Sequence, residues 1–404
     1  MIMKDIKNIK KIVAFLMAVI MIICCSGCAT WDNFKTAFID KPEEIQSIKI
    51  GIFEPTTGAD AQAAADEING IELAHQIYPM IGDRPIELVY ADNGSNVELC
   101  ASAIQSLVDA QVSVILGSYK SIYTLAGSDA IKEARIPAIA ITNTNPIVTQ
   151  TNPYYYRVSY IDSFEETIAA KFIYEQLQTT RVAILLKEGN DYDSAMATEF
   201  VKAFETVTGE EDIVDTVSVP ADIQDYGQYL VNMKYLSPDA IFFPGNLTEG
   251  ENAITTAQRL GYNFTWVGTS NWDGLEIENV YYTLDYDPAK PTTGIAAIMK
   301  NAYKNVYGSD KEPSNAVALG FDAYMLALEG IKNATAQTGY AIKTAIAKVE
   351  NLECSTGYLT MSDSGDPIKE VIVEKYENGE HVIVYTMLPE THGRDDVEDV
   401  ENVE

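Results

Sequence analysis

The chain has 404 residues and a formal net charge of −31 at pH 7, with 59 acidic against 28 basic residues. Such acidity excludes a nucleic-acid partner, because phosphates require Lys and Arg, and it disfavours anionic lipid surfaces. The length exceeds what one hydrophobic core usually holds, so we expect two lobes.

The N-terminal segment has the pattern of a secretory signal. Four lysines precede an apolar run from Ile12 to Ile23, and Ser26-Gly27-Cys28 follows. The run is shorter than the roughly 20 apolar residues of a membrane-spanning helix. We therefore predict a cleaved signal peptide over residues 1–27.

Cys28 defines the next prediction. Small residues directly before a cysteine resemble the lipobox of bacterial lipoproteins, although Cys25 stands where that motif usually has Leu. The resemblance implies a lipidated Cys28, a tether over 28–47 and an extracytoplasmic, membrane-anchored chain. In the alternative, an ordinary signal is cut elsewhere and Cys28 remains a plain thiol.

Short apolar runs alternate with helical patterns over the next hundred residues. The runs are apolar on both faces, as parallel strands covered by helices are. Repeated β–α alternation predicts a doubly wound sheet. The predicted strands span 48–53, 86–91, 112–117 and 139–142, and helical patterns span 68–77 and 97–110.

A second α/β series begins near residue 162, and further helices and a strand hairpin follow it. The hairpin surrounds Asn378-Gly379, a strong signal for a tight turn. The acidic tail at 389–404 is predicted to be disordered. The predicted strands span 182–187, 213–219, 240–244, 264–268, 280–284, 357–361, 370–376 and 381–387, with helices at 164–178, 292–307, 314–334 and 340–349.

Polar and aromatic residues follow the strands of both series. In open α/β sheets ligands bind beyond the carboxyl ends of the strands, so these residues are candidates for a ligand site. They are Tyr119, Ser121, Thr142, Asn143, Thr144, Tyr192, Asn246, Ser270 and Trp272.

Each candidate also has a structural alternative. Ser121, like Ser118, can cap the following helix. Thr142 and Thr144 can be turn residues. A surface ring would explain Tyr192, and core or interlobe packing would explain Trp272.

Hydroxyls, amides and aromatics orient a small polar ligand, but they lack the base that proton transfer or nucleophilic attack requires. The three histidines are widely scattered, and no metal-binding spacing occurs. We therefore predict no enzyme, no metal and no cofactor. A disulfide between Cys100 and Cys354 stays open.

The chain resembles the type I periplasmic binding proteins of the branched-chain amino acid group, which are the substrate-binding components of ABC importers. The resemblance spans residues 48 to 388. Its motifs are Ile48-Lys49-Ile50-Gly51, Asn69-Gly70, Ile115-Leu116-Gly117-Ser118, Thr144-Asn145-Pro146, Tyr155-Tyr156-Arg157, Pro238-Asp239-Ala240-Ile241 and Gly320-Phe321-Asp322-Ala323.

The resemblance implies an α/β fold with two Rossmann-like doubly wound lobes joined by a hinge that the chain crosses three times. The N-terminal lobe then comprises 48–160 plus 291–349, and the C-terminal lobe 161–290 plus 350–388. The implied crossings lie near 159–161, 285–291 and 349–354.

Site roles also follow from the resemblance. Ser121 corresponds to a hydroxyl that binds the ligand carboxylate, and the loop 142–144 holds carboxylate and ammonium. In the other lobe Tyr192 closes on the ligand, and Asn246 and Ser270 add further contacts.

This chain departs from the family at two positions. Ser270 stands where an acid commonly pairs with the ligand ammonium, and Ala63 stands where an aromatic often packs. Asp273, Glu249 and Asp191 are the alternatives for the missing acid.

The predicted function is a lipid-anchored solute-binding protein that delivers a small, amino acid-like ligand to an ABC permease by hinge closure. The alternative is an extracellular sensor of the same fold that signals to a membrane receptor.

Overall fold

A computed structural model describes residues 46–209, 213–288 and 290–388. The predicted signal peptide, Cys28, almost all of the tether and the acidic tail lie outside these residues. The chain separates into two compact units. Of the described residues, the smaller unit holds 46–47 and 82–85, where Arg84 Nε donates to the backbone oxygen of Gln46 at 3.0 Å. The larger unit holds two α/β lobes.

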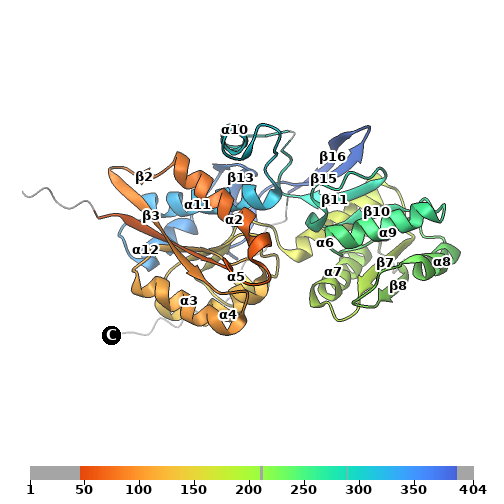
Figure 1. Ribbon diagram of the computed structural model, residues 1–404, viewed down its shortest axis with the longest axis horizontal. Helices are drawn as coiled ribbons and strands as arrows, with labels where there is room; N and C mark the ends of the chain where they lie inside the picture. Colours follow the sequence, from red (N-terminus) through yellow and green to blue (C-terminus); the bar gives the residue numbers. More distant parts are fainter. Residues whose placement is uncertain (1–45, 210–212, 289, 389–404) are drawn as a thin grey trace, which may run out of the picture. The chain divides into compact units, whose positions relative to one another are not determined.

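The first lobe is built on a six-stranded sheet with the order β2-β3-β1-β4-β5-β6. Two of these strands, β2 and β3, are labelled in Figure 1. All pairs from β3 to β6 are parallel. The winding reverses between β1 and β4, which makes their carboxyl ends the topological switch point. The strands are β1 (Ile48–Glu54), β2 (Met80–Ile81), β3 (Arg84–Asp92), β4 (Val114–Gly117), β5 (Ala138–Ala140) and β6 (Tyr155–Arg157).

Helices cover both faces of this sheet. Ile50 and Ile52 of β1 pack into a core with α2 and α11, whereas Phe53 packs with α3 and α4. This two-sided burial agrees with the predicted parallel strands. The strand β3 departs from this pattern, since Glu87 and Tyr90 are exposed. The helices are α2 (Ala61–Ile77), α3 (Val97–Asp109), α4 (Ser121–Ala134), α5 (Ile147–Gln150), α10 (Gly294–Tyr307), α11 (Asn315–Asn333) and α12 (Gly339–Ile346).

The second lobe repeats this winding. Its sheet has the order β16-β15-β11-β10-β9-β7-β8, parallel from β8 to β11, with the switch point between β7 and β9. The predicted hairpin forms the antiparallel edge, and both of its turn residues, Asn378 and Gly379, have positive φ. The strands are β7 (Val182–Lys187), β8 (Ile213–Val219), β9 (Ala240–Phe242), β10 (Thr265–Gly268), β11 (Val280–Leu284), β15 (Val371–Glu377) and β16 (Glu380–Met387).

The helices of the second lobe also cover both faces of their sheet. Phe200 and Phe242 stack in the core with α6 and α7, while Leu230 and Ile254 belong to the core with α8 and α9. The predicted helix 164–178 changes to a π-helical turn at Phe172–Gln176. The α-helices are α6 (Asp162–Lys171), α7 (Asp191–Thr208), α8 (Gly227–Leu236) and α9 (Leu247–Arg259).

A small third sheet differs from the sequence expectation. It contains β12 (Leu352–Cys354), β13 (Gly357–Met361) and β14 (Pro367–Ile368). We placed the third crossing near 349–354, but Cys354, Leu359 and Met361 pack into the α2/α11 core. The chain therefore joins the second sheet only after β14. The remaining lobe boundaries stay a prediction.

The third crossing is held by a buried ion pair. Lys369, between β14 and β15, contacts Asp285 at 2.6 Å, and both side chains are almost fully buried. Thr356 accepts a further hydrogen bond from Lys369 and donates one to Asp322 on α11. Charge and hydrogen bonding thus connect two of the crossing segments.

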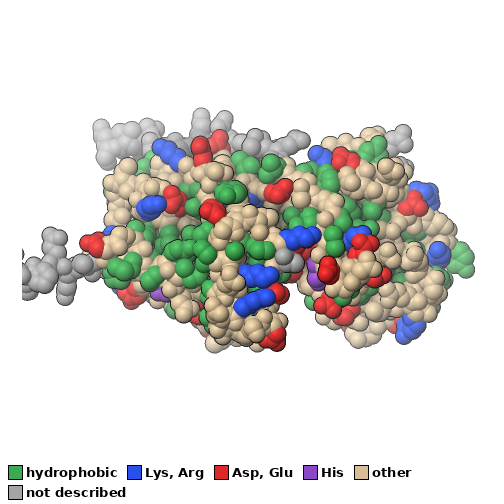
Figure 2. Space-filling model, turned by 90° about the horizontal axis from the view of Figure 1, so that it is seen from above, with side chains coloured by type: hydrophobic (Ala, Val, Ile, Leu, Met, Phe, Trp, Pro, Cys, Tyr) green, Lys and Arg blue, Asp and Glu red, His purple; other side chains and the backbone are tan. Residues whose placement is uncertain are grey.

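Three further features concern the described chain. Cys100 and Cys354 are buried free thiols in separate cores. None of the helices within 46–209, 213–288 and 290–388 is long and apolar enough to cross a membrane. On the face drawn in Figure 2, acidic side chains lie scattered among uncharged ones.

Candidate ligand-binding site

The switch point of the first sheet is organised around a buried carboxyl group. Glu54 is the last residue of β1 and is fully buried. The backbone N–H of Tyr119, in the loop after β4, donates to Glu54 Oε2 at 2.7 Å. Gly117 makes room for this carboxyl group, because a Cβ there would lie 2.4 Å from Glu54 Oε1. Its φ of +109° also favours glycine.

A second buried carboxyl group comes from α2. Glu67 is fully buried and accepts a hydrogen bond at Oε1 from the hydroxyl of Thr142, which follows β5. Close packing of α2 on α11 sets its position. A Cβ on Gly320 would lie 2.2 Å from the backbone oxygen of Glu67. The glycine at position 320 therefore allows α2 to pack close to α11.

Glu54 and Glu67 are within hydrogen-bonding reach of each other. Burial, and then the proximity of Glu67, raise the pKa of Glu54 well above its usual range. Burial raises the pKa of Glu67 to about 7, although the Thr142 hydroxyl opposes the shift. At this edge of the sheet, protonation of the carboxyl groups therefore extends to near-neutral pH.

A buried network joins the loops after β4 and β5. The side-chain amide of Asn143 donates to the Ser118 carbonyl at 2.9 Å, and its oxygen accepts from the Thr124 hydroxyl at 2.6 Å. Asn93 donates to the Ser118 hydroxyl at 2.8 Å. These groups are almost completely buried. Asn143 therefore acts here as a connector between two loops.

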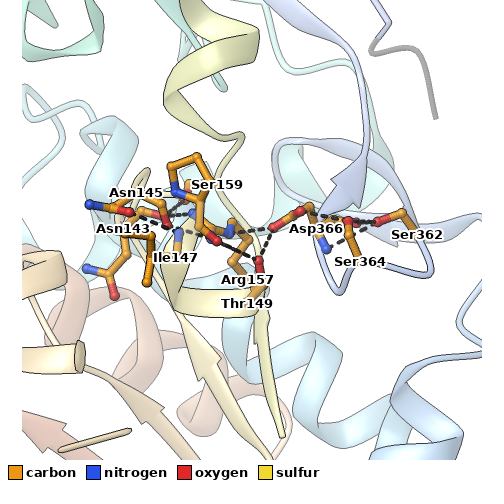
Figure 3. A network of polar contacts seen from close by, with 10 residues as sticks. Asn143, Asn145, Ile147, Thr149, Arg157, Ser159, Ser362, Ser364 and Asp366 are labelled. Carbon is orange, nitrogen blue, oxygen red and sulfur yellow. Dashed lines mark hydrogen bonds and ion pairs between the residues drawn. The ribbon is translucent and has the colours of Figure 1, made fainter. Parts of the chain in front are cut away.

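Arg157, at the end of β6, fixes the 143–149 loop (Figure 3). Its guanidinium donates to the carbonyls of Asn143 and Asn145 at 2.7 and 2.8 Å. Nε pairs with Asp366 at 2.7 Å, and Thr149 also donates to Asp366. Arg157 is fully buried, so these contacts balance its charge and attach the loop to the end of β6.

Ser121 begins α4 but does not cap it. The residue before the helix is Lys120, whose side chain makes no capping bond. Lys120 instead pairs with Asp60 at 2.6 Å. The capping alternative for Ser121 is therefore wrong. Ser121 and Thr144 are both half-buried.

The switch point of the second sheet carries an ion pair. Lys187, at the end of β7, contacts Glu249 on α9, and both are partly buried. Asn246 is exposed and caps α9 in a reciprocal capping box with Glu249. The backbone N–H of Lys187 donates to Asp193 at 3.0 Å. Tyr192 is half-buried beside Asp193, in the first turn of α7.

Ser270 and Trp272 lie in a short 3₁₀ turn after β10. Trp272 is fully buried, and its Nε1 donates to the Gly245 carbonyl at 2.7 Å. Its ring packs so closely on Gly250 and Gly268 that a Cβ on either would lie 2.6 or 2.3 Å away. Trp272 therefore packs inside its lobe, as the structural alternative to a ligand contact predicted.

The comparisons with known proteins agree with this architecture. The family model described as periplasmic binding protein matches residues 47–370. The chain belongs to this family. Periplasmic binding proteins act outside the cytoplasm, which agrees with the predicted compartment.

Curated relatives are about one fifth identical to this chain over the part that aligns. The leucine-specific-binding protein of Salmonella typhimurium is 22% identical over 238 residues, which cover 58% of this chain and 63% of the relative. The Leu/Ile/Val-binding protein of Escherichia coli is 21% identical over 58% of this chain and 64% of its own length. The chain thus spans somewhat under two thirds of these relatives.

Solved periplasmic binding proteins match over more of the chain. A leucine-binding protein from Thermotoga maritima is 28% identical with a TM-score of 0.74, covering 85% of this chain and 99% of its own. A branched-chain amino acid transporter substrate-binding protein from Streptococcus pneumoniae, solved with isoleucine, is 25% identical with a TM-score of 0.73, over 85% and 99%. These neighbours support two α/β lobes of the type I class.

Two of the acids that we considered as substitutes for the acid missing at Ser270 have other partners in the structure. Asp273 Oδ2 accepts the N–H of Asn315 at 2.9 Å, and Glu249 pairs with Lys187. The side chain of Asp191 lies outside the described residues. A different carboxylate contacts Ser270: Glu165 accepts the backbone N–H of Ser270 at 2.7 Å.

Sequence reasoning missed Glu54, Glu67 and Glu165. Glu54 had a recognisable signal, since an acid directly after an apolar strand stands at the edge where ligands bind. Glu67 had a weaker signal, because its burial depends on how closely α2 packs on α11. Nothing in the local sequence placed Glu165 next to Ser270, which lies 105 positions away.

Proposed function

We propose that this chain is an extracytoplasmic solute-binding lipoprotein of an ABC importer, which binds an amino acid or a related small carboxylate between its lobes. One observation carries the proposal. In a periplasmic binding protein, two sheets of the same winding present hydroxyl, amide and N–H groups at their switch points. Such positions are where α/β sheets bind ligands.

The residues of the first lobe suit the anionic end of a ligand. Ser121 and Thr144 have half-buried hydroxyls, and Thr142 and Asn143 lie in the same loop. Because Arg157 and Asn143 hold this loop, little ordering is required when a ligand binds. The leucine- and isoleucine-binding neighbours support an amino acid as the first ligand class to examine.

The residues of the second lobe supply the opposing contacts. Tyr192 offers an aromatic face, Asn246 and Ser270 offer polar groups, and Trp272 supports the 3₁₀ turn from beneath. We infer hinge closure as the mechanism, in which a ligand that contacts both lobes shifts an open–closed equilibrium toward the closed form. The closed form then docks on a permease.

Lipidation at Cys28 is part of the same proposal. We expect the intact mass of the membrane-extracted protein to match a chain that begins at a diacylated Cys28. Cys28→Ser would release the protein from the membrane fraction without changing its affinity for ligand. An unmodified Cys28 in the mature wild-type chain would contradict the anchor while leaving solute binding intact.

The decisive experiment is a thermal-shift screen of residues 29–404 against amino acids, small carboxylates, amides and purines. A ligand at a hundredfold excess over its Kd stabilises the native state by about 2.7 kcal/mol. We expect an aliphatic amino acid to produce such a shift.

Variants make this screen specific. Ser121→Ala and Thr144→Ala should abolish the shift, while Ser102→Ala and Thr255→Ala should retain it. Both control hydroxyls are exposed and bond only within their own helices. A shift with another solute class alone would contradict the amino acid assignment, and no shift with any solute would contradict solute binding.

A further inference from the structure

Two buried carboxyl groups lie beneath the candidate ligand loops and are not used by the proposed ligand contacts. Glu54 and Glu67 are both 0% exposed. Each accepts one hydrogen bond from a different loop, from the Tyr119 N–H and the Thr142 hydroxyl respectively. The pair therefore connects β1, α2 and the loops after β4 and β5.

One oxygen of each carboxyl group has no donor from another residue. Within the described part of the chain, Glu54 Oε1 and Glu67 Oε2 are buried and accept no such bond. The two carboxyl groups are in reach of each other. Neither forms an ion pair with a described Lys or Arg; the nearby Lys120 pairs with Asp60 instead.

Two ionised carboxylates in contact, buried and without a cation, are strongly unfavourable. A single proton relieves this repulsion, because the neutral carboxyl group then donates a hydrogen bond to its ionised partner. The surrounding titratable groups do not supply a balancing positive charge. They are Asp60 and Tyr119 from the neighbouring loops, Asp66 from α2 and Tyr155 from β6.

We propose that Glu54 and Glu67 share one proton, and that this proton makes solute binding pH-dependent by holding the Tyr119 and Thr142 loops together. Loss of the proton places two negative charges beside the position proposed for the ligand carboxylate. Both residues are positioning residues, because they act through the two loops. The binding half of this inference rests on the proposed function, whereas the shared proton does not.

The raised pKa values of both groups agree with this arrangement. Burial raises the pKa of Glu67 to about 7 and raises the pKa of Glu54 well above its usual range. Protonation of the pair therefore extends to near-neutral pH and is lost as pH rises through the raised pKa values. An affinity that needs the proton falls about tenfold for each pH unit above the controlling pKa.

The first arm of the test detects the proton without any ligand. Infrared spectra of the purified protein in D₂O at pH 7 should contain a protonated-carboxyl band that disappears at pH 9.5. Glu54→Gln and Glu67→Gln should each remove it, because the amide then donates to the remaining carboxylate. Glu374→Gln is the matched control, since Glu374 is a buried carboxyl group of the other lobe. Absence of the band, or its persistence in both Gln variants, overturns the inference.

The second arm measures the Kd for L-isoleucine by calorimetry from pH 6 to pH 9. Wild type and Glu374→Gln should bind at least tenfold more weakly at pH 9 than at pH 6. Glu67→Gln should bind with nearly constant affinity, because its amide keeps both hydrogen bonds without titrating. Glu67→Ala should bind weakly at every pH.

The outcomes separate the two proposals. A flat wild-type profile, or a Glu67→Gln profile that falls like wild type, overturns the binding role of the pair. A wild-type protein that binds no solute at any pH contradicts the proposed function, and the infrared band then decides the shared proton by itself.

Discussion

The two lobes have the same winding, yet their switch points balance charge in different ways. In the first lobe, Glu54 and Glu67 are fully buried and within reach of each other, and neither forms an ion pair with a described Lys or Arg. In the second, Glu249 pairs with Lys187, and both side chains are partly exposed. One edge thus depends on a proton and the other on a permanent positive charge.

Because of this difference, we expect the first edge to respond to pH and the second to respond to salt. A proton shared by buried carboxyl groups leaves when pH rises through their pKa values. A partly exposed Lys–Glu pair keeps its charges over the same range but is screened by salt. Topology alone therefore does not determine the electrostatics of an equivalent site.

The largest effect is expected for Arg157→Met in the first lobe. The change removes a fully buried guanidinium, its ion pair with Asp366 and its hydrogen bonds to two loop carbonyls. Breaking a buried ion pair in this way costs about 3–5 kcal/mol. Urea unfolding should show this loss, while Arg259→Met should change stability by less than about 0.5 kcal/mol, because its pair with Asp225 is exposed. Equal losses of stability in the two variants would contradict a special role for the buried contacts of Arg157.

Gly117→Ala is next, and Gly189→Ala is its counterpart after β7. Both glycines have positive φ, but a Cβ at Gly117 would lie 2.2 Å from the Phe53 carbonyl, whereas Gly189 has open space. We expect a loss of about 3 kcal/mol for Gly117→Ala and about 1 kcal/mol for Gly189→Ala in urea unfolding. A similar cost at both positions would mean that β1 and β4 are less closely packed at this edge.

The pH dependence of stability should differ between wild type and Glu67→Gln. The folded-state pKa of Glu67, about 7, lies above its unfolded value of about 4.3, so the native state binds the proton more tightly. This contribution is fully present below about pH 4.3 and is lost as pH rises through 7. Between pH 5 and pH 8, wild type should lose about 2–3 kcal/mol relative to Glu67→Gln in urea titrations. Parallel curves would contradict the raised pKa.

The smallest effect is expected at the second switch point. Lys187→Met removes a partly exposed ion pair, so a loss of about 1 kcal/mol is expected at low salt, decreasing as salt is added. Lys202→Met, which breaks a more exposed pair with Glu199, should be nearly neutral. Thermal unfolding at two salt concentrations distinguishes them. A loss at Lys187 as large as that at Arg157 would remove the contrast between the lobes.

Sequence periodicity was sufficient for most of the fold. Both parallel series, the edge hairpin at Asn378-Gly379 and the family were predicted, because apolar runs and turn residues encode them locally. The candidate loops after β4, β5, β7, β9 and β10 also lie at the carboxyl ends of these strands, as the sequence predicted. Their ligand roles stay predictions, as do Cys28 and the acidic tail, which lie outside the described residues.

The amino-acid sequence by itself therefore determined the two windings, the family and the edges at which polar residues gather. Only the tertiary structure decided that Cys354 and Met361 pack with the first core, that Trp272 supports a turn, and that Glu54 meets Glu67. The reason is physical: local patterns specify which face of an element is apolar, but contacts between distant elements depend on how closely backbones approach. At Gly320 and Gly117 the missing side chains allow that approach, and the buried carboxyl pair follows from it.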